Sequence, residues 1–146
     1  MTYPHPDVAR VLASEFVPVR INVEDRPEVA RQFSLLWSPA LLTIDHRRFL
    51  LRQTAGYLPP AEMLAELLLA QGLFELRRAR HANALAKFVQ LVVLYPASAV
   101  AAEAVYWEGV AAYRVSKNKE DLWVVWRRLL RQYPNSLWAA KTTLLD

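Results

Sequence analysis

The chain has 146 residues, of which 54% are hydrophobic and 22% charged, and its formal net charge is +4. This composition is typical of one or two globular domains and excludes a disordered chain. No segment reaches the roughly 18 apolar residues of a membrane helix and no signal peptide is visible, so we expect a cytoplasmic protein without membrane contact. The sequence contains no cysteine, which excludes disulfides, thiolate nucleophiles and cysteine-bound zinc from these residues.

The first half of the chain alternates between helical and strand patterns. Pro6 and Pro27 open two predicted helices, because proline suits the first turn of a helix. Residues 16–23 carry a valine or isoleucine at every second position, which is the alternation of a half-buried strand. Asp25 or Arg26 is expected to cap the helix that follows. The predicted helices of this half are residues 6–15 and 27–34, and the predicted strands are residues 16–23, 40–44 and 49–55, the last two antiparallel.

The second half is predicted to be helical throughout, and it contains a repeat. Tyr95-Pro96 and Ser98 recur as Tyr133-Pro134 and Ser136, 38 residues later, and each serine is expected to cap the next helix. Small and aromatic residues before each Tyr-Pro pair resemble the tetratricopeptide repeat, in which small residues let antiparallel helices approach closely. The positions assigned to repeat packing are Gly72, Ala84, Phe88, Pro96, Gly109, Trp126 and Pro134. The predicted helices are residues 60–76, 82–94, 98–115, 120–132 and 136–144.

The stretch LLWSPALLTID, residues 35–45, places Pro39 directly before an apolar strand. Together with FVPVRINVED, PEVARQFSL and FLLRQTAGYLPPAEMLAEL, it resembles the latter part of the thioredoxin fold over residues 3–69. The resemblance implies that Pro39 is cis and that Trp37, Ser38 and Pro39 contact a bound peptide. The whole chain resembles bacterial thioredoxin-family proteins with tetratricopeptide-like helices. We therefore expect an α/β unit, residues 1–70, and an all-α array, residues 71–146, which share the helix that begins near residue 60.

Thioredoxins carry a central strand and a Trp-Cys-x-x-Cys motif before the point where this resemblance starts, and the chain has neither. Two explanations stay open: the N-terminus is truncated, or the scaffold is used without the redox chemistry. The missing strand would lie between residues 16–23 and 40–44. We favour direct parallel pairing of these segments, which gives an incomplete thioredoxin-like three-stranded mixed sheet. The other solution is assembly, in which a second copy or a partner chain supplies the strand.

The function that we favour is a non-catalytic module that binds another protein or a peptide. The alternative is a thiol–disulfide oxidoreductase of the thioredoxin family whose active-site segment is missing from this chain. We expect no catalytic residue, no cofactor and no metal, because His5, His46 and His81 share no helix face with a carboxylate. Nucleic acid is not expected as a partner, since the arginine clusters accompany no nucleic-acid motif. A homodimer is compatible with the pattern.

Overall fold

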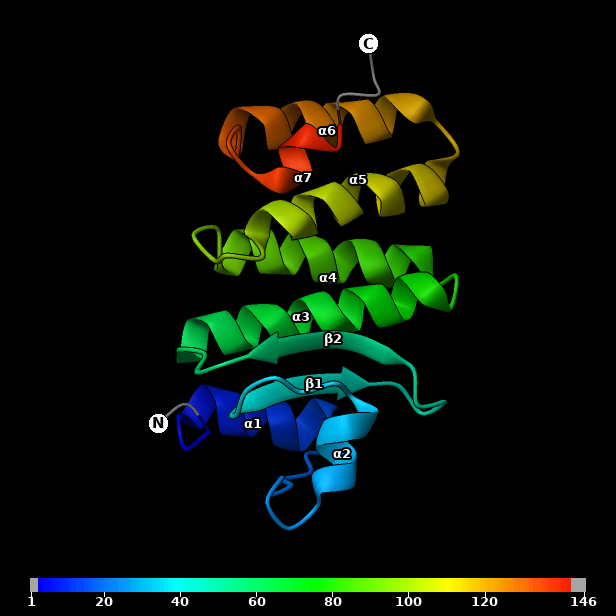
Figure 1. Cartoon of the computed structure of the whole chain (residues 1–146). Coiled ribbons are helices and arrows are strands. Elements are labelled where there is room, and N and C mark those ends of the chain that lie inside the picture. The colour runs from blue at the N-terminus through cyan, green and yellow to red at the C-terminus, as the bar shows by residue number, and fades with distance from the viewer. Residues whose placement is uncertain (1–2, 143–146) are drawn as a thin grey trace. The chain divides into compact units, whose positions relative to one another are not determined.

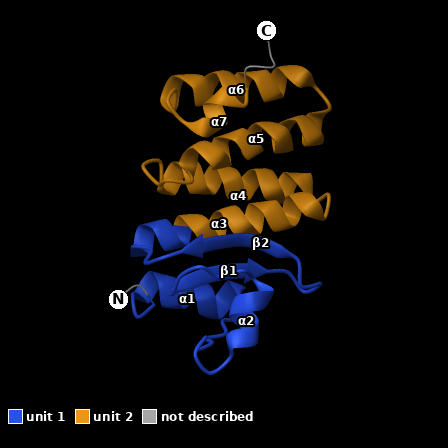
Figure 2. Cartoon of the chain, in the orientation of Figure 1, with its two compact units in different colours: residues 1–64 blue, residues 65–146 orange. Residues whose placement is uncertain are grey.

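The computed structural model describes residues 3–142. The chain divides into two compact units, residues 1–64 and residues 65–146, which we describe separately (Figure 2). The described part is mostly helical, with one small antiparallel sheet. The elements in chain order (Figure 1) are α1 (Pro6–Glu15), α2 (Pro27–Gln32), β1 (Ala40–Ile44), β2 (Leu50–Ala55), α3 (Pro60–Arg77), α4 (His81–Leu94), α5 (Ala101–Ser116), α6 (Lys119–Gln132) and α7 (Leu137–Ala140).

The sheet of unit 1 is a two-stranded hairpin. Ala40 lies opposite Ala55 and Leu42 opposite Gln53, with an irregularity between Thr43 and Ile44. The turn is fixed by Asp45, whose Oδ1 accepts the N–H groups of Arg47 at 2.8 Å and Phe49 at 2.9 Å. An aspartate that accepts from backbone groups two and four residues ahead sets a tight turn, and this locks the register of the two strands.

The prediction of a third strand at residues 16–23 is wrong, and so is the three-stranded mixed sheet. The described sheet holds β1 and β2 only, and residues 16–22 form no regular element. A strand is stable only when a neighbour takes up its backbone N–H and C=O groups. The alternation in this segment predicts how its side chains would face in a sheet, but it does not supply the neighbouring strand.

The two helices of unit 1 begin at prolines, in the positions where the sequence predicts them. Pro6 and Pro27 occupy the first turn of α1 and α2. Of the two residues predicted at the cap, Arg26 is the N-cap residue of α2, and its side chain makes no capping hydrogen bond. Asp25 instead accepts from the side chain of Asn22 at 3.0 Å, within the turn before α2.

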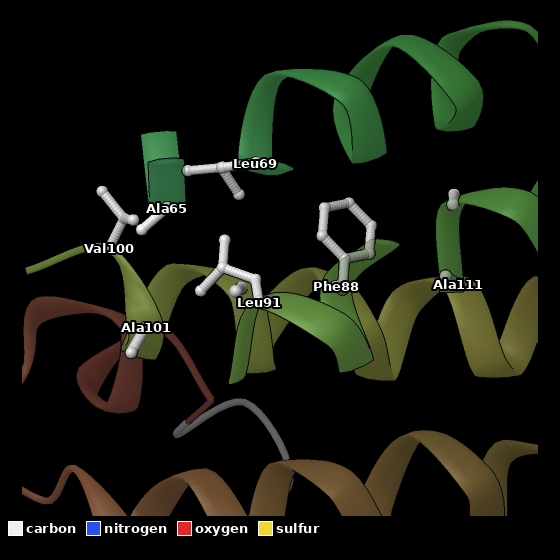
Figure 3. Close-up of a cluster of buried hydrophobic side chains, with 9 residues drawn as sticks. Ala65, Leu69, Phe88, Leu91, Val100, Ala101 and Ala111 are labelled. Carbon is white, nitrogen blue, oxygen red and sulfur yellow. The ribbon is translucent and has the colours of Figure 1, made fainter. Parts of the chain in front are cut away.

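In unit 2, successive helices pack as antiparallel neighbours (Figure 1), with one apolar cluster around Phe88 and another around Val105 and Leu129. Figure 3 shows Phe88 and Leu91 of α4 between the α3 residue Leu69 and the α5 residue Ala111. Phe88 is fully buried, and its ring lies against Gly72, where an added Cβ would be 2.3 Å from Cε1. A side chain at this position would overlap the ring unless the ring moved, so the close approach of the two helices favours glycine here.

The same contact recurs one repeat later. Trp126 of α6 is buried against Gly109 of α5, where an added Cβ would lie 2.6 Å from Cδ1 of the indole. The indole Nε1–H donates to the Tyr106 carbonyl at 3.0 Å, and the two rings stack with centroids 4.7 Å apart. The pairs of small and aromatic residues in the repeat thus mark two equivalent helix–helix contacts.

The Tyr-Pro pairs lie at helix ends. Tyr95 and Tyr133 are the C-cap residues of α4 and α6, and the Tyr133 hydroxyl donates to the Pro96 carbonyl at 2.7 Å. Pro96 and Pro134 are exposed and follow directly after the ends of α4 and α6. They therefore end these helices, and they do not pack in the core as the repeat had suggested.

Two of the helices predicted in unit 2 are shorter in the structure, and α2 of unit 1 ends at Gln32 and not at residue 34. α5 begins at Ala101, because residues 97–100 form turns in which Ser98 Oγ accepts the Val100 N–H at 3.2 Å. Ser136 does cap α7, with its Oγ accepting the Ala139 N–H at 3.0 Å. Residues 143–144, the end predicted for this last helix, lie outside the described residues.

Candidate functional site

The loop before β1 presents apolar side chains to solvent. Leu36 is 95% exposed and Trp37 is 70% exposed, and the Ser38–Pro39 peptide bond that follows them is cis. Large apolar side chains in adjacent loop positions are costly to leave in water, and such patches mark contact surfaces. The three residues singled out from the sequence, Trp37, Ser38 and Pro39, therefore lie together at the entrance to β1.

One edge of β1 has free backbone groups. The Gly56 N–H donates to the Pro39 carbonyl at 2.7 Å, so these two residues form a hydrogen-bonded pair of the ladder. Because such pairs alternate along an antiparallel ladder, Leu41 and Thr43 bond towards β2, whereas Ala40 and Leu42 direct their N–H and C=O groups away from it. Among the described residues, no backbone hydrogen bond takes up these outward groups.

A small apolar cavity lies where the two strands begin and end. Its volume is about 120 Å³, and its lining includes Pro39, Ala40, Gly56, Tyr57 and Met63. Drug-sized ligands occupy pockets of roughly 300–1,000 Å³, so this cavity is too small for such a ligand. Its size and lining suit one aliphatic side chain.

Apart from Pro39, the cavity residues were not identified from the sequence. Gly56, Tyr57 and Met63 come from the end of β2 and the start of α3, and only the hairpin brings them to Pro39. Leu36 could have been found, because Leu35, Leu36 and Trp37 are three consecutive apolar residues in a loop and cannot all point into a core.

Some arginines of the clusters at residues 77–80 and 127–131 contact neighbouring side chains. Arg80 pairs with Glu75, and the guanidinium carbons of Arg78 and Arg80 lie 5.5 and 5.4 Å from the centroid of the Phe74 ring. Arg128 pairs with the buried Glu108 at 2.5 Å. Arg128 thus joins α6 to α5, whereas the contacts of Arg78 and Arg80 are local to the end of α3 and the turn after it.

Burial changes the pKa of one carboxyl group that lies between two helices. Desolvation raises the pKa of Glu108 above its ordinary value, and the charge and hydrogen bond of Arg128 offset only part of this effect. The pair joins α5 to α6 beside the contact between Gly109 and Trp126. Because the pair lies between two helices, we assign it to the packing of these helices and not to a binding site.

In residues 3–142, no three histidine or acidic residues lie close enough together to hold a metal ion. In the same range, no helix is long and apolar enough to cross a membrane. Comparison of the chain with protein-family models, with curated proteins and with solved structures finds no match.

Proposed function

We propose that the chain is a non-catalytic protein-interaction module, in which a thioredoxin-like α/β unit is joined to a tetratricopeptide-like helical array. Its site binds an extended peptide segment as an added strand on β1. The outward backbone groups of Ala40 and Leu42 carry the proposal, because an exposed strand edge is a template for such pairing. Trp37 and Leu36 beside this edge supply apolar contact.

The cavity at the mouth of β1 defines the chemistry of the peptide. Its lining is mostly apolar and its volume, about 120 Å³, suits one aliphatic side chain. Main-chain hydrogen bonds give a peptide affinity without sequence preference, whereas side-chain pockets give specificity. The site therefore favours an extended segment with an aliphatic residue at the position that reaches Pro39.

The test is a selection of peptides from a random displayed library against the whole chain, followed by amide hydrogen exchange with a selected peptide bound. We expect enrichment of peptides with alternating aliphatic residues. We also expect exchange to slow at the amides of Ala40 and Leu42, while the Leu41 amide, already bonded within the hairpin, serves as the internal control.

Replacement of Trp37 provides a second, independent test of the same site. Trp37→Ser removes an exposed side chain and should weaken peptide binding by about tenfold, the effect of roughly 1.4 kcal/mol, without changing stability. The proposal is overturned if no peptide is enriched, or if bound peptides leave the exchange of Ala40 and Leu42 unchanged.

A further inference from the structure

Residues 17–21 have the pattern of a strand but lack a strand partner. Val17 is 91% exposed, Val19 75% and Ile21 45%, all far more exposed than is usual for these side chains. Between described residues, no backbone hydrogen bond takes up an N–H or C=O group of this segment. Figure 1 shows the loop that carries it at the bottom of the view, between α1 and α2.

Both ends of this segment are fixed outside the sheet. At one end, the Phe16 N–H donates to the Leu12 carbonyl and ends α1. At the other, Asn22 accepts from the Arg26 N–H and its side chain bonds to Asp25 in the turn before α2. The segment is therefore tethered as an exposed loop, and the edge of β1 in the same chain stays unpaired.

The segment and the edge match in length and in bonding pattern. Residues 17–21 and 40–44 are both five residues long. In an extended chain, Val17, Val19 and Ile21 would present their N–H and C=O groups along one edge, and Pro18 would lie on the other. Since proline lacks an N–H group, a segment containing Pro18 can pair on one side only, as an outermost strand does.

We propose that two copies of the chain associate by strand pairing, with residues 17–21 of each copy added to the β1 edge of the other. This inference rests on the proposed function, because it names the polypeptide that occupies the site. The exchange is reciprocal, so it closes into a two-fold dimer and does not continue as an open chain of copies. It also covers the exposed valines and the outward groups of Ala40 and Leu42 in one step.

The experiment is sedimentation equilibrium of the full chain over a wide concentration range, with two matched proline variants. Val19→Pro removes an N–H group from the pairing edge, whereas Arg20→Pro removes one from the opposite edge. Neither N–H group bonds within the described chain, so both variants should keep the thermal unfolding of the unmodified protein. Each dimer would lose two ladder bonds in Val19→Pro, which should raise the dimer dissociation constant at least about tenfold, against less than about twofold for Arg20→Pro.

Amide hydrogen exchange tests whether the association takes place at the edge of β1. The Ala40 and Leu42 amides should become protected as the protein concentration rises, and Val19→Pro should remove that protection. The inference is overturned by a chain that stays monomeric, by protection that does not depend on concentration, or by a dimer that both proline variants affect equally. A monomer that still binds selected library peptides would refute the self-association and leave the proposed function standing.

Discussion

The contact between Gly72 and Phe88 allows a quantitative test of how the helical array is packed. In Gly72→Ala, the new methyl carbon would lie 2.3 Å from Cε1, 2.7 Å from Cδ1 and 2.8 Å from Cζ of the Phe88 ring. Carbon atoms in contact are normally about 3.5–4.0 Å apart, so the ring would have to move by more than 1 Å. Phe88 is fully buried in a close-packed core, and the core offers no space for that movement.

Two opposing free-energy terms determine how much Gly72→Ala changes the stability of the protein. Insertion of a methyl group into a packed core costs about 1–3 kcal/mol, whereas replacement of glycine by alanine inside a helix gains about 0.8–1.0 kcal/mol. The difference between these two terms is about 0–2 kcal/mol, and we expect Gly72→Ala to lower the free energy of unfolding by this amount. Gly109→Ala should behave in the same way, because its methyl carbon would lie 2.6 Å from Cδ1 and 2.7 Å from Nε1 of Trp126.

This change in stability can be measured by urea unfolding. Tryptophan fluorescence is a suitable signal, because four of the five tryptophans lie in residues 107–138. Ala86→Gly, at an exposed position of α4, measures the helix-propensity term alone in the same protein. Phe88→Leu in the Gly72→Ala background should relieve the overlap, so the double variant should lose less stability than the sum of the single changes. A gain of about 1 kcal/mol in Gly72→Ala would refute the close packing, since propensity alone would then explain the result.

Three further predictions concern unit 2. Trp126→Phe should lower the free energy of unfolding by about 1–2 kcal/mol, because it loses volume and the hydrogen bond to the Tyr106 carbonyl; a loss below about 0.5 kcal/mol in urea titration would contradict that contact. Ala79→Gly should raise stability by about 0.5–1 kcal/mol, seen as a higher melting temperature, because Ala79 has a φ of 57° at the end of α3, a conformation that glycine adopts without strain; an unchanged or lower melting temperature would speak against it. Burial raises the pKa of Glu108, so the folded protein binds this proton more tightly than the unfolded chain, and stability should fall as pH rises from the ordinary glutamate pKa through the folded value. Urea titrations from pH 4 to 7 should show that this fall is smaller in Glu108→Gln, and equal slopes would refute the shift.

Elements whose signals are local in sequence were predicted with accurate boundaries. Helix α1 begins at Pro6 and ends at Glu15, and β1 covers Ala40–Ile44, as the sequence predicts. Proline at a helix start and a short apolar run bounded by turn residues act within a few residues of the chain. The segment 16–23 shows the limit of this reasoning, because pairing depends on a neighbouring strand that no local pattern can supply.

The same distinction between local and long-range signals applies to the candidate site. Trp37, Ser38 and Pro39 are adjacent in sequence, so one loop is sufficient to bring them together. The outward direction of Ala40 and Leu42 depends on their register with β2, which follows from the turn at Asp45 and not from β1 itself. The cavity depends on the meeting of Pro39 with Met63, which is separated from it by the entire hairpin.

The distribution of exposed apolar side chains connects the fold of unit 1 with its proposed interaction. Of the seventeen large hydrophobic side chains that are exposed in the described chain, ten lie within residues 1–64. A segment of that size buries a smaller fraction of its surface than a larger domain does, and few of its side chains are fully covered here. Such a unit opens locally at low free-energy cost. A strand that binds β1 would add both backbone hydrogen bonds and apolar cover, so binding would stabilise the folded form of unit 1 by mass action. Binding would also fix the conformations of the loop at Trp37 and the segment at Val19, whose side chains are exposed. The entropy lost in this way would lower the affinity, and the order of unit 1 would depend on its partner.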